Sequence, residues 1–258
     1  MDSSLFDATH LNQLAEKFCG DYAQADPFPH VVIDGLVPNA VLAKVLEEFP
    51  APSEPFWGKY IHANSRKLAS NDLNRMGPIS RELIRELNAP LFLQFLEKLT
   101  GMAGIIPDPY LQGGGLHQIE RGGFLKVHAD FNLHPKLNVD RRLNLLLYLN
   151  RDWQEDWGGQ LELWDRSMSS ARKKIHPLFN RCVVFSTTDF SYHGHPDPLT
   201  CPENRTRKSI ALYYYTNGRP LRERSAAHST LYRQRPQEKV PLWRTLLGAV
   251  KSKIDGSS

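Results

Sequence analysis

The feature that most constrains the fold of this 258-residue chain is a series of short apolar segments that begins near Leu111. Glycine pairs, a glycine triplet and a cluster of prolines separate these segments, as turns separate the strands of an all-β domain. The predicted strands span residues 116–120, 124–128, 142–149, 161–164, 181–186 and 208–216. Many short strands at this spacing predict a β-sandwich or a jelly roll.

The residues before this series have mainly helical periodicity. Apolar side chains recur at the spacing of one helix face in four segments, residues 5–23, 38–49, 80–87 and 90–99. A β-branched run at residues 28–35 ends in Asp34-Gly35, which is typical of a strand closing on a turn. The polar residues 57–77 are predicted to form a surface loop, which could also serve as a lid over a site.

Helices first and strands after predict an α+β fold, a double-stranded β-helix (jelly-roll) core buttressed by N-terminal helices. In this organisation, residues 1–110 pack on a core formed by residues 111–217. Residues 218–258 are predicted to be a basic C-terminal tail with nine Lys/Arg against three Asp/Glu. We expect the three parts to form one integrated domain.

Composition is that of a globular protein, with 41% apolar and 23% charged residues and a net charge of +4. No apolar run approaches the length of a membrane span, and residues 1–9 lack the features of a secretory signal. The three cysteines match no metal-binding spacing and suggest reduced thiols in a cytoplasm. The basic surplus lies near the C-terminus, and we expect neither a nucleic acid nor a membrane as partner. Oligomeric state is left open.

His128 and Asp130 lie two residues apart on a predicted strand, so their side chains point to the same face and can bind one ion. A His-x-Asp triplet alone is a weak signal, because a histidine is often a structural residue. A third ligand is available in His193, at the end of the apolar strand expected to begin at Cys182. Two imidazoles and one carboxylate form the facial triad that holds Fe(II) with open positions.

Two other histidines have to be weighed against these ligands. His195 shares the alternating face of His193, but Gly194 and Pro196 suggest that the strand ends near His193, which favours His193. His134 precedes Pro135 and is predicted to lie in a surface loop.

Arg207 and Tyr148 are candidates for binding an oxo acid beside the ion. Arg207 opens a predicted strand, and a guanidinium can donate two parallel hydrogen bonds to a carboxylate. Tyr148 lies in a nearly continuous apolar run, typical of a strand buried on both faces, and would place a phenol in an apolar pocket. Taken alone, each could equally be structural, Arg207 as a charged strand entry and Tyr148 as a core residue.

The ordered set of motifs resembles the Fe(II)/2-oxoglutarate-dependent oxygenases, in particular their prolyl-4-hydroxylase-like branch, over residues 116–216. The motifs are His-x-Asp at 128–130, Tyr-Leu-Asn at 148–150, Gly-Gly-x-Leu at 158–161, the distal histidine and Arg-x-Ser-Ile at 207–210. The interval between the distal histidine and Arg207 is longer than is usual for the family and contains three prolines, which leaves Arg205 as an alternative to Arg207.

The resemblance implies roles for six residues. His128, Asp130 and His193 match the iron ligands, and Arg207 matches the residue that pairs with the distal carboxylate of 2-oxoglutarate. Tyr148 matches a phenol that assists this arginine, and Gln118 stands where relatives have another polar contact with the cosubstrate.

The implied activity is that of a dioxygenase with Fe(II) and 2-oxoglutarate as cofactors and O2 as cosubstrate. It would hydroxylate a prolyl or other amino-acid or peptide substrate, or another small molecule, and release succinate and CO2. A carboxylate at Asp130 favours hydroxylation over halogenation, because it fills the position that a halide would take. The alternatives are a metal-binding jelly roll without turnover and, prompted by the basic C-terminal residues, a nucleic-acid demethylase.

Overall fold

The computed structural model of the protein describes residues 5–238. Four α-helices and three short 3-10 helices occur in this part of the chain. They are α1 (Ala8–Gln24), α2 (Asn39–Glu47), α3 (Pro78–Leu87), α4 (Pro90–Thr100), η1 (Leu73–Arg75), η2 (Glu155–Trp157) and η3 (Leu221–Glu223). Proline occupies the first turn of α3 and α4, where its missing N–H is not needed. None of the described helices is long and apolar enough to cross a membrane.

The described strands form one curled, antiparallel sheet with the order β1-β10-β7-β12-β5-β3-β6-β11-β8-β9. Strands β13, β2 and β4 lie beside this path, on β6, β3 and β12. The bounds are β1 (His30–Asp34), β2 (Gly58–His62), β3 (Ser65–Ser70), β4 (Ile106–Pro107), β5 (Gly115–Ile119), β6 (Phe124–Ala129), β7 (Asp140–Tyr148), β8 (Leu161–Trp164), β9 (Ala171–Ile175), β10 (Arg181–Ser186), β11 (His193–His195), β12 (Arg207–Thr216) and β13 (Leu231–Tyr232).

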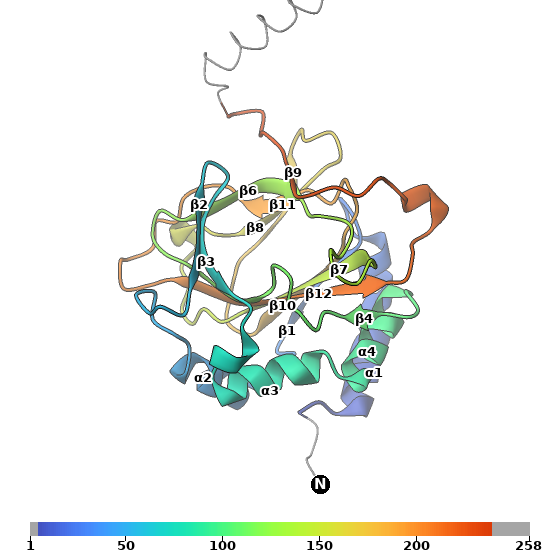
Figure 1. The fold of residues 1–258 in the computed structure, drawn as a ribbon, viewed down its shortest axis with the longest axis horizontal. Helices are drawn as coiled ribbons and strands as arrows, with labels where there is room; N and C mark the ends of the chain where they lie inside the picture. The colour runs from blue at the N-terminus through green and yellow to red at the C-terminus, as the bar shows by residue number, and fades with distance from the viewer. Residues whose placement is uncertain (1–4, 239–258) are drawn as a thin grey trace, which may run out of the picture.

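The sheet folds back on itself, so that β10, β7 and β12 face β6, β11 and β8 across an interior, and the helices cover the outside of the first group (Figure 1). Strand β7 shows how the sequence produces this arrangement. Its residues Leu143, Leu145 and Leu147 join the core cluster that includes the helices, whereas the alternate residue Tyr148 joins a separate cluster inside the sheet. A strand buried on both faces was expected here, and the structure confirms it.

The predicted strands of the core are all present, with ends shifted by at most a few residues. The strand predicted at residues 28–35 is β1, and it pairs with β10 as the edge of the main sheet. The N-terminal part therefore supplies strands as well as helices.

Two expectations are corrected by the structure. Residues 57–77 are not mainly a loop, because β2 and β3 form a hairpin in which β3 also pairs with β5 and β6. His193 does not end the strand that contains Cys182: β10 ends at Ser186, and His193 begins the separate strand β11. In the described part of the predicted C-terminal tail, β13 pairs with β6. Residues 239–258 of that tail lie outside the described residues.

Candidate active site

His128, Asp130 and His193 converge at one end of the interior between the two parts of the sheet. His128 on β6 and His193 on β11 are direct cross-strand partners, and Asp130 follows the end of β6. One ligand atom from each of the three residues lies within 4.8 Å of the others. Nε2 of His128 lies 3.5 Å from one carboxylate oxygen of Asp130, and Nε2 of His193 lies 3.5 Å from the other. The structure thus brings the three predicted ligands together.

Backbone carbonyl groups hold both imidazoles in the orientation that a metal ion requires. Nδ1 of His128 donates to the carbonyl of Lys126, and Nδ1 of His193 donates to the carbonyl of Ser191, each at 2.8 Å. With the proton on Nδ1, the lone pair of Nε2 is free and points toward Asp130. Burial lowers the pKa of His193 to about 4, so that this imidazole is neutral and able to bind a metal at neutral pH.

The carboxylate of Asp130 is fixed by two side chains of β7. Its Oδ2 accepts hydrogen bonds from Nη2 of Arg141 at 3.0 Å and from Nδ2 of Asn144 at 2.8 Å. Burial alone would raise the pKa of Asp130, but the Arg141 guanidinium and the two imidazoles hold it well below its usual range. Arg141 is itself fully buried, with its guanidinium 3.5 Å from the centre of the Tyr213 ring. Sequence reasoning missed this arginine, although its position beside the apolar run was a usable signal.

This donor set fits Fe(II). Two imidazoles and one carboxylate, all on one side of the space between them, are the ligands of the facial triad of non-haem iron oxygenases. The fixed tautomers and the pinned carboxylate mean that the three groups need little rearrangement to receive an ion.

Arg207 lies in the same pocket, deeply buried at the start of β12. It donates from Nε to the carbonyl of Gly159 at 2.8 Å and from Nη2 to the phenol oxygen of Tyr148 at 3.2 Å. Burial raises the pKa of Tyr148, which keeps it a neutral phenol, and burial lowers the pKa of Arg207, an effect that the neighbouring Tyr148 opposes. Arg205, the alternative, donates to the carbonyl of Arg151 and lies over the ring of Trp157, and it does not line the pocket.

Two sequence predictions in this region need correction. Gln118 does not reach the pocket: it points to the opposite face of β5, where its amide contacts the carbonyl of Pro50 and the hydroxyl of Thr206. The side chain that β5 turns inward is its neighbour His117. His134 is not a surface residue, because it is fully buried and its Nε2 lies 3.1 Å from Asp108.

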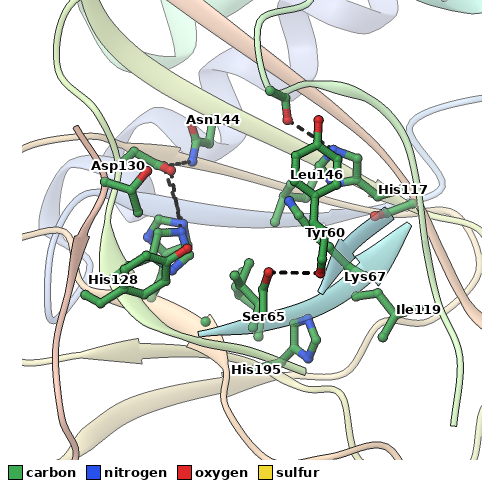
Figure 2. Close-up of a pocket in the computed structure, with 18 of the residues that line it drawn as sticks. Tyr60, Ser65, Lys67, His117, Ile119, His128, Asp130, Asn144, Leu146 and His195 are labelled. Atoms are coloured by element: carbon green, nitrogen blue, oxygen red, sulfur yellow. Dashed lines mark hydrogen bonds and ion pairs between the residues drawn. The ribbon is translucent and has the colours of Figure 1, made fainter. Parts of the chain in front are cut away.

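The pocket around these residues has a volume of about 230 Å³. Its metal-ligand end is formed by His128, Asp130 and Asn144, while Lys67 and His117 lie toward the other end, as Figure 2 shows. His195 also points into the pocket, and neither of its ring nitrogens has a hydrogen-bond partner among the described residues. His195 is not part of the group of ligand atoms that lies within 4.8 Å.

Two separate segments form the rim of the pocket. Tyr60 and His62 come from the β2–β3 hairpin, and Thr230 and Tyr232 come from the segment that contains β13. The rings of His62 and Tyr232 lie 6.3 Å apart at a steep angle, so that the two segments meet above the site. Strand β13 also pairs with β6, where Tyr232 stands opposite His128.

The buried imidazole of His117 predicts a pH dependence of stability for the metal-free protein. Burial is the largest cause, and the charge of Lys67 the next, of a pKa of His117 well below its usual value. A hydrogen bond to the carbonyl of Gly113 acts in the opposite direction and raises this pKa. Below about pH 6.5 the unfolded chain binds a proton that the folded chain does not, so stability falls with falling pH by up to about 1.4 kcal/mol per pH unit. Urea unfolding between about pH 5 and pH 7 should show a smaller slope for His117→Gln than for the wild type. Equal slopes would contradict this assignment.

Comparisons with known proteins agree with this geometry. Residues 114–215 match the family model of the 2OG-Fe(II) oxygenase superfamily. The prolyl 3-hydroxylase OGFOD1 of Mus musculus is 27% identical over 194 residues, which are 74% of this chain but 33% of that protein. The chain therefore spans about a third of the length of this curated relative.

Solved structures of prolyl hydroxylases share the fold. A prolyl-4-hydroxylase of Pseudomonas putida superimposes with a TM-score of 0.55 at 15% identity, over 79% of this chain and 100% of that one. A prolyl hydroxylase of Trichoplax adhaerens, in complex with a peptide fragment of the hypoxia inducible factor oxygen degradation domain, gives 0.57 at 18% identity, over 80% and 91%. The predicted double-stranded β-helix is thereby confirmed. Residues 114–215, which carry the three predicted metal ligands and Arg207, are thus similar to the 2OG-Fe(II) oxygenase superfamily, and the solved prolyl hydroxylases share the fold of this chain.

Proposed function

We propose that this protein hydroxylates a C–H bond of a prolyl or other amino-acid or peptide substrate, with 2-oxoglutarate and O2 consumed and succinate and CO2 released. The observation that carries the proposal is the convergence in one pocket of a three-residue metal site and a buried arginine–tyrosine pair. The three-residue site offers the ligands that Fe(II) binds, and the arginine–tyrosine pair offers hydrogen-bond donors to a carboxylate of a dicarboxylate cosubstrate.

In this proposal His128, Asp130 and His193 bind Fe(II), which supplies the activation of O2 that couples decarboxylation of the oxo acid to oxidation of the substrate. The chain's own part is to hold the ligands on one face and leave the other coordination positions open. Arg141 and Asn144 restrict the Asp130 carboxylate, so that it cannot swing away from the two imidazoles. The substrate would enter below the rim formed by the β2–β3 hairpin and β13.

Arg207 and Tyr148 would bind the distal carboxylate of 2-oxoglutarate. The guanidinium already uses Nε and Nη2 within the protein, on Gly159 and Tyr148, and its remaining N–H groups are available to the cosubstrate. A buried cation without a carboxylate partner in the described chain is costly, and a bound dicarboxylate would supply that partner. Tyr148, as a neutral phenol, can donate to the same carboxylate.

We also propose that the three sequence regions work as one domain. Residues before 111 supply β1, β2 and β3 to the sheet, and β13 belongs to the region after 217. Since residues from all three regions line the pocket, the catalytic unit extends beyond the core at residues 111–217.

The test is an anaerobic titration of the Fe(II)-loaded protein with 2-oxoglutarate, followed by the weak visible charge-transfer band of the chelate. We expect the band to appear on titration and succinate to form once air is admitted. Folded, iron-loaded protein that shows neither the band nor succinate would contradict the proposal and favour a metal-binding jelly roll without turnover.

A further inference from the structure

Lys67 is a cation in the pocket that the proposed chemistry of iron and cosubstrate does not use. It lies on β3, directly opposite Tyr60 of β2, and its side chain lines the same pocket as His128 and Arg207. Its ammonium nitrogen lies 5.6 Å from the centre of the Tyr60 ring. Within residues 5–238 it forms no ion pair and no hydrogen bond, in contrast to Arg141 and Arg207.

The surroundings of Lys67 leave its charge poorly compensated. Burial lowers the pKa of Lys67 to about 8, even though the carboxylate of Asp130 acts in the opposite direction. The group is still mainly protonated at neutral pH, so Lys67 is a half-buried ammonium that has lost part of its hydration and forms no ion pair within residues 5–238. Charges that lose hydration in folded proteins are normally paired, so an unpaired one that lines a pocket points to an anionic ligand.

The net charge of the pocket with Fe(II) and 2-oxoglutarate bound also favours an anionic ligand at Lys67. The lining residues include Lys67, Arg141 and Arg207 as cations and Asp130 as the carboxylate, which Arg141 already pairs. Fe(II) and 2-oxoglutarate carry charges of equal size and opposite sign, so their binding leaves the positive excess of the pocket in place. With one cosubstrate carboxylate at Arg207 and the other beside the metal, Lys67 is still without a partner.

Lys67 is more exposed to solvent than Arg207, the proposed anchor of the cosubstrate. Arg207 is 4% exposed and bonded to Gly159 and Tyr148 inside the sheet, whereas Lys67 is half-buried. The cross-strand neighbour of Lys67 is Tyr60, a rim residue that is 48% exposed. Lys67 therefore lines the pocket between the rim residue Tyr60 and the interior, on the side away from His128 and Asp130 (Figure 2).

We propose that the substrate carries a carboxylate near the carbon that is oxidised, as a free amino acid or the C-terminal residue of a peptide does, and that Lys67 binds this carboxylate. This inference rests on the proposed function and specifies its substrate class. It makes Lys67 a specificity-determining residue. An internal residue of a polypeptide would not meet this requirement, because its backbone carboxyl group forms a peptide bond and carries no charge.

The experiment uses the anaerobic Fe(II)·2-oxoglutarate complex and pairs of probes that differ in one carboxylate. L-proline is compared with L-prolinamide, and N-acetyl-L-proline with N-acetyl-L-prolinamide; a panel of other amino acids, each as free acid and amide, follows. Binding is measured by the change in the charge-transfer band. We expect at least one acid to bind about tenfold or more tightly than its amide, because a hydrogen bond to a charged group contributes about 1.5–3 kcal/mol. The free and N-acetylated arms distinguish a free amino acid from a peptide C-terminus.

Variants then test whether Lys67 is responsible. Lys67→Met should remove the preference for the acid and leave the affinity for 2-oxoglutarate within about twofold, and Lys67→Arg should restore much of the preference. The matched control is Lys59→Met, at an exposed lysine of β2 in the same hairpin, which should behave as wild type. A Lys67→Met protein that loses affinity for 2-oxoglutarate would overturn the inference, since Lys67 would then be a second cosubstrate anchor.

Two further results would overturn the inference while the proposed function stands. The first is that acids and amides bind equally well to a wild-type complex that shows the charge-transfer band. The second is that no acid of the panel changes this band. Absence of the band itself, before any probe is added, is the different result that contradicts the proposed function.

Discussion

Replacing His128 by alanine is expected to weaken Fe(II) binding by more than about 100-fold, since loss of an outer partner of a metal ligand alone typically costs 10–100-fold. The variant removes one of three atoms that lie within 4.8 Å of one another, and the remaining two cannot define a facial site. Binding is measured by titrating the metal-free protein with Fe(II) under anaerobic conditions. Succinate formation in air should be lost with it, because the proposed reaction begins at the metal.

Two histidine variants serve as controls for this prediction. His10→Ala, at an exposed position of α1, should bind Fe(II) as the wild type does. His195→Ala removes an imidazole that lines the pocket but lies outside the ligand group, and it should keep the metal. Loss of Fe(II) from His195→Ala together with retention in His193→Ala would show that the distal ligand had been assigned to the wrong histidine.

Replacing Arg207 by methionine is expected to reduce the affinity for 2-oxoglutarate by at least about 30-fold, because truncating one partner of a buried, hydrogen-bonded charge pair costs about 2–5 kcal/mol. Methionine keeps much of the volume and removes the charge. Fe(II) binding should be unchanged, since Arg207 contacts Gly159 and Tyr148 and none of the three metal ligands. The measurement is the 2-oxoglutarate titration of the iron-loaded variant.

Arg205→Met is the matched control for this second prediction. Arg205 lies two residues away on the same segment but outside the pocket, so its removal should leave the titration unchanged. Equal losses in the two variants would indicate a general disturbance of the start of β12. Tyr148→Phe, which removes only the phenol that Arg207 contacts, should produce a smaller loss than Arg207→Met.

The sequence predicted the parts of the fold that depend on local pattern. The nearly continuous apolar run at residues 142–149 predicted β7, and the apolar run from Cys182 predicted β10. Strand β9 was missed because its Arg-Lys-Lys centre is exposed and carries no apolar alternation. The β2–β3 hairpin was read as a loop because β2 is exposed throughout and forms strand structure only through pairing with β3.

The candidate site was predictable where two residues share one strand and less so where it depends on long-range contacts. Spacing was sufficient for His128 and Asp130, which lie on and just after β6. Gln118 was misplaced because the resemblance suggested a residue of β5, and only the pairing of that strand shows which neighbour, His117, faces inward. The contact of Arg141 and Asn144 with Asp130 joins two strands, and no local pattern contains it.

The pairing of β6 has a consequence for how this protein can be cut into fragments. Strand β6 lies between β11 on one side and β3 and β13 on the other, and β3 and β13 come from outside residues 114–215. A fragment limited to the family match would expose backbone N–H and C=O groups along β6 beside the metal ligands, as a newly made sheet edge. Domain dissection or grafting of this protein should therefore keep the hairpin at residues 58–70 and the segment through residue 238, as both shield the strand that bears the site.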